Sequence, residues 1–127
     1  MRIALAVLMA LHGMAHLVGF TGSFQLASPG TIPYKTTILA GKLDIGGPGV
    51  RTMGVFWLLT ALAFLVAAGA ALASWPGWVL TGLAVSLFSL LLCLIAMPDA
   101  RIGAGVDFLI VAALLVGQRL ELFSPIP

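Results

Sequence analysis

The chain has 127 residues, of which 61% are hydrophobic and only 8% are charged. A soluble domain carries roughly 25% charged residues, so six basic and four acidic side chains cannot cover the surface of a water-soluble fold. The mean hydropathy of +1.19 agrees. These values exclude a soluble enzyme. They also exclude a nucleic-acid-binding domain, because a net charge of +2 provides too few cations to bind phosphates.

Four apolar stretches follow one another along the chain. They cover residues 3–20, 53–73, 78–97 and 102–120. Each approaches the roughly 20 apolar residues that a helix needs to cross a bilayer. Backbone amides in lipid must be bonded within their own segment, which favours helices. We therefore expect an all-α fold, an antiparallel bundle of four transmembrane helices that forms a single domain over residues 1–127.

The connections between these stretches differ in length. Residues 74–77 and 98–101 form tight turns, which make neighbouring helices antiparallel. Residues 21–51 form a long connection that contains prolines, glycines and apolar side chains. We expect it to pack as a cap over one end of the bundle. The first stretch contains His12 and His16, so we interpret it as a transmembrane helix rather than a signal peptide.

Three ionisable side chains lie inside the apolar stretches, namely His12, His16 and Asp107. Such groups are costly in a bilayer and mark candidate functional sites. His12 and His16 are four residues apart and therefore share one helix face. A rise of about 1.5 Å per residue places His16 and Asp107 at matching depth near the 21–51 connection. The sequence predicts an acid/base pair of His16 and Asp107 in a polar pocket at this end, with His12 deeper beside them.

Further charged side chains gather at the same end of the bundle. Arg51 lies before the second apolar stretch, and Asp99 and Arg101 lie in the turn before the fourth. As site residues, the two arginines would stabilise developing negative charge or the ionised form of Asp107. The structural alternatives are that the arginines extend to the interface and that Asp99 caps the fourth helix. The pair of His16 and Asp107 would then only fix helix packing.

His12 and His16 also have the spacing of two ligands that share one metal ion. Zinc usually takes three or four ligands, and the third would have to be Asp107, Asp99 or Asp44. No glutamate follows the first histidine, as it does in the HExxH motif of zinc proteases. We therefore expect no cofactor, and His12 and His16 remain the metal ligands if an ion is bound.

The third apolar stretch carries small and polar side chains on one face. They are Gly82, Ser86, Ser89 and Cys93. Their spacings of four, three and four residues keep them on one side of a helix. Such faces let transmembrane helices approach closely and form hydrogen bonds. We expect this face to serve helix packing.

Three short segments carry a resemblance to known sequences. Residues 12–20 read HGMAHLVGF, which has the pattern HGxxHLxGF. Gly54 and Trp57 form a Gly-x-x-Trp in the second stretch, and residues 99–103 read DARIG before the fourth. In these segments the chain resembles a group of small, functionally uncharacterised bacterial membrane proteins with four helices. The resemblance implies this fold but no activity.

These observations lead to three hypotheses about function. The first is a membrane-embedded enzyme that performs acid/base chemistry on a lipophilic small molecule. Isomerisation, cyclisation and epoxide opening fit, because they need proton transfer and no soluble cofactor domain. The alternative is a non-catalytic accessory or structural subunit of a larger membrane complex. The second alternative is a small metal-ion or proton carrier or sensor that uses His12 and His16.

The expected surroundings follow from the same composition. We expect the lipid bilayer and a lipophilic small molecule as partners, and no nucleic acid. A homo-oligomer or a larger membrane complex is compatible with the small-residue faces. We expect the protein in the bacterial cytoplasmic membrane.

Overall fold

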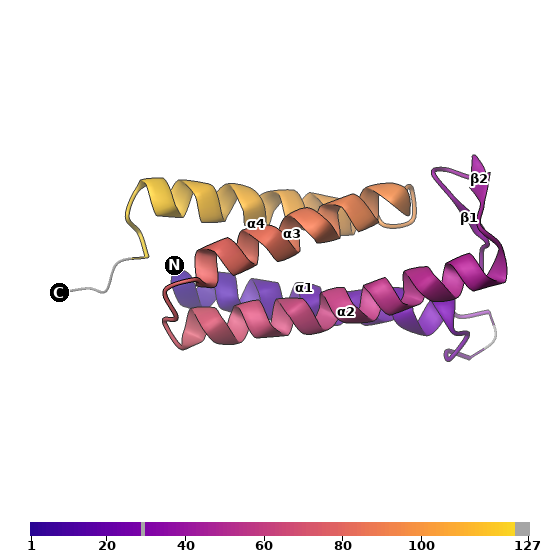
Figure 1. Cartoon of the computed structure of the whole chain (residues 1–127), viewed down its shortest axis with the longest axis horizontal. Coiled ribbons are helices and arrows are strands. Elements are labelled where there is room, and N and C mark those ends of the chain that lie inside the picture. Colours follow the sequence, from indigo (N-terminus) through magenta and orange to yellow (C-terminus); the bar gives the residue numbers. More distant parts are fainter. Residues whose placement is uncertain (29, 124–127) are drawn as a thin grey trace.

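The computed structural model describes residues 1–28 and 30–123, which form four helices and a short hairpin (Figure 1). The helices are α1 (Arg2–Ser23), α2 (Gly46–Leu72), α3 (Trp78–Ile95) and α4 (Arg101–Arg119). The strands are β1 (Thr37–Ile38) and β2 (Leu43–Asp44), which pair antiparallel with Thr37 opposite Asp44. Each of the four helices is long and apolar enough to cross a membrane. The expected all-α bundle of four transmembrane helices is confirmed.

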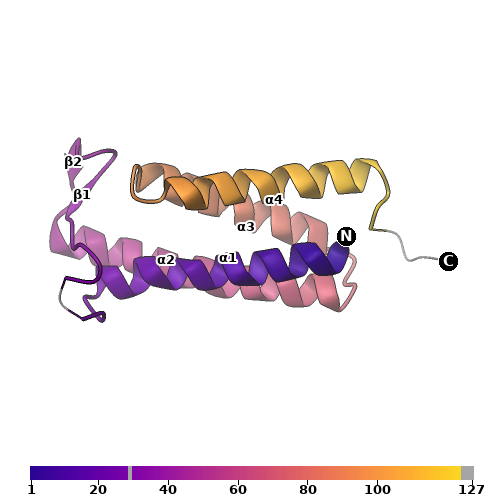
Figure 2. The same ribbon diagram turned by 180° about the vertical axis from the view of Figure 1, so that it is seen from behind.

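The four helices form two layers. α1 packs along α2 in one layer, and α3 packs along α4 in the other (Figures 1 and 2). Successive helices run in opposite directions, so α1 begins and α4 ends at one end of the bundle. The strands β1 and β2 lie at the other end, which we call the hairpin end. Between the layers, α2 and α3 are in extensive contact, whereas α1 and α4 touch each other much less.

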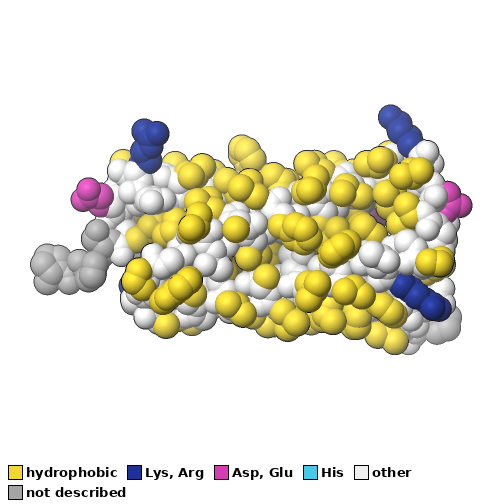
Figure 3. Space-filling view, in the orientation of Figure 1, with side chains coloured by type: hydrophobic (Ala, Val, Ile, Leu, Met, Phe, Trp, Pro, Cys, Tyr) yellow, Lys and Arg dark blue, Asp and Glu magenta, His cyan; other side chains and the backbone are white. Residues whose placement is uncertain are grey.

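Apolar side chains cover the outside of the bundle between its ends. Val66 is 65% exposed and Phe108 is 67% exposed. Figure 3 shows apolar side chains over the middle of one face and charged side chains near its two ends. Exposed apolar surface of this extent is not found on soluble monomers, whereas lipid solvates it. The chain is an integral membrane protein.

One half of the interior is filled with apolar side chains. It lies toward the end where α1 begins and α4 ends. Its buried members are Leu5, Ala6, Met9, Phe64, Ala67, Ala68, Ala71, Trp78, Ile110 and Leu114. Lipid is as apolar as these side chains, so close packing rather than exclusion of water holds this half together. We call it the packed half.

Glycines allow α1 to lie close against α2. A Cβ atom at Gly13 would stand 2.7 Å from Cβ of Phe64 and 3.0 Å from the carbonyl oxygen of Ala61. A Cβ atom at Gly19 would stand 2.7 Å from the ring of Trp57. Close approach through small residues is common between transmembrane helices. Here it brings the histidine-bearing face of α1 against aromatic rings of α2.

The connection between α1 and α2 is shorter than the expected residues 21–51. The helix α1 continues to Ser23, and α2 already begins at Gly46. Residues 46–49 are rich in glycine and proline and form the first turn of α2. Pro48 is tolerated there because the first four N–H groups of a helix have no partner within it. The composition of this turn is therefore compatible with a helix start as well as with a loop.

Hydrogen bonds join the hairpin to two helices. The carboxylate of Asp44 accepts the N–H of Gly46 at 2.9 Å. This bond, and a second one with the side chain of Thr36, lower the pKa of Asp44. At the turn of the hairpin, the N–H of Leu39 donates to the carbonyl of Ile95 at 2.9 Å. The hairpin thus connects the start of α2 to the end of α3.

We predict that Gly13→Ala destabilises the bundle, because the added methyl group would press α1 away from Phe64 and Ala61. Overpacking of this kind costs about 1–3 kcal/mol. Gly69→Ala in α2 is the matched control, since its Cβ would meet nothing within 4 Å. Thermal unfolding in detergent micelles should show a lower midpoint for Gly13→Ala and an unchanged or raised midpoint for Gly69→Ala. Equal midpoints for both variants would contradict the close packing of α1 on α2.

Candidate functional site

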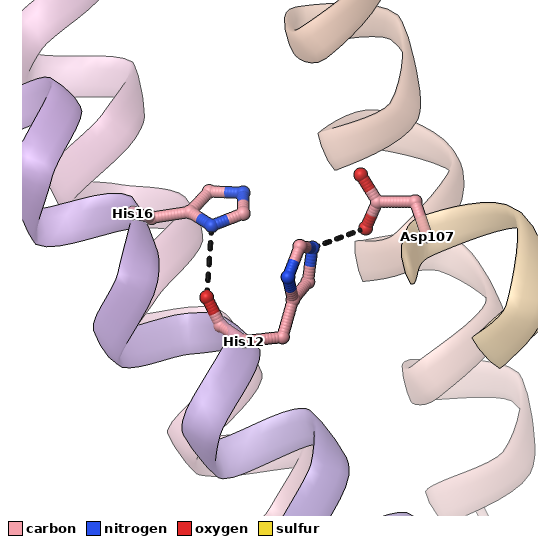
Figure 4. Close-up of side chains that lie close together, drawn as sticks. All are labelled: His12, His16 and Asp107. Atoms are coloured by element: carbon pink, nitrogen blue, oxygen red, sulfur yellow. Dashed lines mark hydrogen bonds and ion pairs between the residues drawn. The ribbon is translucent and has the colours of Figure 1, made fainter. Parts of the chain in front are cut away.

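Four side chains from three helices form one hydrogen-bonded network inside the bundle. His12 and His16 come from α1, and both are at most 5% exposed. Ser89 of α3 and Asp107 of α4 are fully buried, at 0%. His12 Nε2 donates to Oδ1 of Asp107 at 2.8 Å, and His16 Nδ1 donates to the carbonyl oxygen of His12 at 3.0 Å (Figure 4). Ser89 Oγ lies 2.7 Å from Oδ2 of Asp107 and 2.7 Å from Nε2 of His16.

Helical spacing and aromatic packing together place the two histidines. The four-residue separation puts both imidazoles on the inner face of α1. The ring of Phe64 packs edge-on against His12, with ring centroids 5.0 Å apart. The ring of Trp57 packs in the same way against His16, at 5.2 Å. These contacts hold His12 Nε2 toward Asp107 of α4 and His16 Nε2 toward Ser89 of α3.

The network needs one more proton than two neutral histidines, the Ser89 hydroxyl and an ionised Asp107 supply. Its four hydrogen bonds require four protons. Neutral His12 and His16 bring one N–H each, the Ser89 hydroxyl brings one more, and an ionised Asp107 brings none. The fourth proton completes the network in either of two places. On His16 it makes an imidazolium that donates to Ser89, and on Asp107 it makes a carboxylic acid that donates to Ser89.

The fourth proton also makes the network electrically neutral. Without it, the network carries the negative charge of Asp107, which is costly in a buried site within a bilayer. Among the hydrogen bonds and ion pairs of the described residues, no lysine or arginine reaches this carboxylate. The two neutral forms interconvert when protons shift across the Ser89 hydroxyl. A complete network therefore has this fourth proton, which we call the shared proton, on Asp107 or on His16.

A cavity of about 600 Å³ borders the network at the hairpin end. Its mostly apolar wall includes Ile38, Val50, Met53, Trp57, Ile102 and Val106, and also both histidines of the network. Both ring nitrogens of His16 are engaged in hydrogen bonds. By contrast, Nδ1 of His12 has no hydrogen-bond partner among the described residues. His12 is thus the histidine with a free nitrogen for a molecule in the cavity.

An ion pair lies beside the cavity. Lys35 Nζ is 2.9 and 2.8 Å from the two carboxylate oxygens of Asp99. Both side chains belong to the cavity wall, and they are 50% and 62% exposed. Exposed pairs contribute roughly 0–1 kcal/mol. The pair therefore links the segment before β1 to the α3–α4 turn only weakly.

The expected direct pairing of His16 with Asp107 is wrong. His12 bonds to the carboxylate directly, and Ser89 stands between His16 and Asp107. The physical reason is that His16 turns Nδ1 toward a carbonyl of its own helix, which directs Nε2 at α3. The depth estimate gives the height of each side chain along the bundle, but not the helix that it faces.

The other predicted site residues lie away from the network. Arg51 and Arg101 are exposed and do not belong to the cavity wall. Asp99 does belong to this wall, but the alternative that it caps α4 is wrong. The cap residue is Ala100, which makes no side-chain hydrogen bond to the helix, and the carboxylate of Asp99 is bonded to Lys35 instead.

Ser89 belongs to the network, although its sequence pattern predicts only helix packing. Ser86 and Ser89 are both fully buried, yet Ser86 Oγ has no hydrogen-bond partner among the described residues. Cys93 lies one turn further along α3 and belongs to the cavity wall. In the sequence, the face of small and polar side chains on α3 is the feature that points to Ser89. It identifies Ser89 as a member of the network only when the position of this face relative to α1 and α4 is known.

Three side chains of the network also form a group that can hold a metal ion. Ligand atoms of His12, His16 and Asp107 all lie within 4.8 Å of one another. Of the three carboxylates that the sequence offered as a third ligand, Asp107 is therefore the one in place. Asp44 and Asp99 are outside this group.

No family model, curated protein or solved structure matches the chain. The resemblance carried by residues 12–20, 54–57 and 99–103 therefore stays a prediction. The function must be argued from the network and the cavity beside it.

We predict that Ser89→Ala destabilises the protein and that Ser86→Ala does not. Loss of the Ser89 hydroxyl leaves polar atoms of His16 and Asp107 unpaired, and each unpaired buried group costs about 1–3 kcal/mol. Ser86→Ala is the matched control on the same helix, because it removes a hydroxyl without a described partner. Thermal unfolding in detergent micelles measures the difference. If both variants unfold at the wild-type midpoint, Ser89 does not bridge the network.

Proposed function

We propose that the protein is a membrane-embedded enzyme that performs acid/base chemistry on a lipophilic small molecule in the cavity. One observation carries the proposal. A buried hydrogen-bonded network of two histidines, a serine and an aspartate lies against an apolar cavity whose wall contains two of its members. Isomerisation, cyclisation and epoxide opening are the reaction types that fit, because each needs a proton to be moved at a fixed position.

In this proposal His12 is the catalytic residue. Its Nε2–H donates to Asp107, which leaves Nδ1 as the basic nitrogen that takes a proton from the bound molecule and returns it. Asp107 keeps His12 in this tautomer and stabilises the imidazolium that forms, as carboxylates do in other histidine pairs. When His12 becomes positive, an ionised Asp107 is favoured. The shared proton then moves across Ser89 toward His16, and it moves back when His12 releases its proton.

The cavity supports a lipophilic substrate. Its volume of about 600 Å³ is within the roughly 300–1,000 Å³ that is usual for small-molecule sites. The wall is mostly apolar, and its polar side chains are those of His12, His16, Ser23, Tyr34, Lys35, Thr37 and Asp99. A cavity with such a wall suits an apolar molecule that lies beside His12.

The shape of the interior favours catalysis over a proton carrier and over a purely structural subunit. A proton carrier needs a polar path to both sides of the membrane, but apolar side chains fill the packed half. Among the described residues, Ser86 is the buried polar side chain between the network and the end of the bundle where α1 begins. A purely structural subunit would be at least as stable with an apolar interior, because buried ionisable groups rarely add stability. The network and the cavity together are better explained by chemistry.

The place of this activity follows from the same proposal. The site lies among helices apolar enough to cross a membrane, so a substrate dissolved in lipid is near it. On the resemblance of residues 12–20 to bacterial proteins, we place the enzyme in the bacterial cytoplasmic membrane.

The proposal predicts that the purified protein converts a lipid-soluble compound. Wild-type protein in detergent is incubated in ²H₂O with a total lipid extract of the cells that produce it, and the extract is analysed by chromatography and mass spectrometry. We expect one compound to become an isomer or to gain the elements of water. His12→Gln and Asp107→Asn should slow this conversion at least about 100-fold, because an acid/base group contributes that much or more.

Two control variants make this experiment specific. Ser86→Ala changes a buried serine outside the network, and Arg101→Gln changes an exposed charge outside the cavity wall. Both should retain the wild-type rate. An extract left unchanged by the wild type, or conversion that persists in His12→Gln and Asp107→Asn, would refute the proposal.

A further inference from the structure

We infer that the network is also a binding site for a divalent transition-metal ion, with His12, His16 and Asp107 as its ligands. Zn²⁺ is the probe that its donor set fits best, since imidazole nitrogen and carboxylate oxygen are both common zinc ligands. The inference goes beyond the proposed reaction and does not rest on it.

The ligand atoms are already close to the separations that one ion requires. Zinc holds nitrogen and oxygen ligands at roughly 2.0–2.2 Å, so two ligands of one ion lie about 3–4 Å apart. The ligand atoms of His12, His16 and Asp107 are all within 4.8 Å of one another. His12 Nε2 and Asp107 Oδ1 are 2.8 Å apart and would separate slightly, while His16 would move closer. These are small side-chain movements.

Two existing hydrogen bonds orient the ligands for an ion. His16 Nδ1 donates to the carbonyl of its own helix at 3.0 Å, which leaves Nε2 free to present its lone pair. Ser89 donates to Oδ2 of Asp107 at 2.7 Å, which leaves Oδ1 for the ion. Metal-binding histidines and carboxylates generally have such outer hydrogen-bond partners. Both bonds are compatible with a bound ion.

An ion would also offset the negative charge of the Asp107 carboxylate, which is costly in a buried site. It would be held by Nε2 of both histidines and by Oδ1 of Asp107. Three protein ligands leave a coordination position open, and His12 and His16 both belong to the cavity wall. Three ligands with an open position are the usual arrangement of a catalytic zinc site.

Zinc titration of the full chain in detergent, followed by calorimetry, tests the inference. We expect wild-type protein to bind close to one ion per chain. Asp107→Asn and His16→Gln should each weaken binding by more than the roughly 10–100-fold that loss of an outer partner costs. Ser89→Ala is the matched control within the network, because it removes an outer partner but no ligand. Ser86→Ala should bind zinc like the wild type, because Ser86 Oγ has no hydrogen-bond partner among the described residues.

A second measurement uses wild-type protein alone and so does not depend on how the variants fold. X-ray absorption spectroscopy of the zinc-loaded wild type counts the imidazole ligands of the bound ion, and we expect two. Zinc that binds the wild type no more tightly than Asp107→Asn, or that has no imidazole ligand, would overturn the inference.

The two proposals fail in different ways. Conversion of a lipid by wild-type protein that binds no zinc would leave the proposed enzyme in place and remove the metal site. Stoichiometric zinc binding without any lipid conversion would establish the metal site and remove the proposed enzyme.

Discussion

The hydrogen bond between His12 and Asp107 is the interaction on which the site depends. A carboxylate inside a bilayer must be bonded and neutralised, and Asp107 is fully buried with both oxygens engaged. The bond also joins α1 to α4, two helices that otherwise touch each other little. Through Ser89 the network reaches α3 as well. One buried carboxylate therefore ties the two layers of the bundle together, next to the cavity that both histidines line.

The bundle divides into two halves with different tasks. The packed half joins all four helices through close apolar contacts, and the network lies at its border. Toward the hairpin end the layers enclose the cavity instead. There the hairpin bonds to the end of α3, and a weak ion pair joins Lys35 to the next turn. A rigid base with a hollow end positions polar groups accurately and still leaves room for a ligand.

The sequence predicts the fold well and the site in part. Apolar length alone identifies the four helices, because lipid leaves a spanning backbone few alternatives. It misplaces the start of α2, since glycine and proline near Pro48 are equally compatible with a loop and with a first helical turn. Depth along the helices brings His12, His16 and Asp107 to one region. Depth cannot give the pairing, which depends on how each helix is rotated about its axis, and for the same reason the sequence predicts only a packing role for Ser89.

The shared proton can be observed directly in metal-free protein. Solid-state NMR in lipid bilayers, with ¹⁵N-labelled histidine and ¹³C-labelled aspartate, reports the protonation of both rings and of Asp107, which is assigned by comparison with Asp107→Asn. At neutral pH we predict that His16 has two N–H groups or that Asp107 is a carboxylic acid, with His12 protonated on Nε2 in either case. Two neutral histidines beside an ionised Asp107 would contradict the shared proton, and with it the acid/base site.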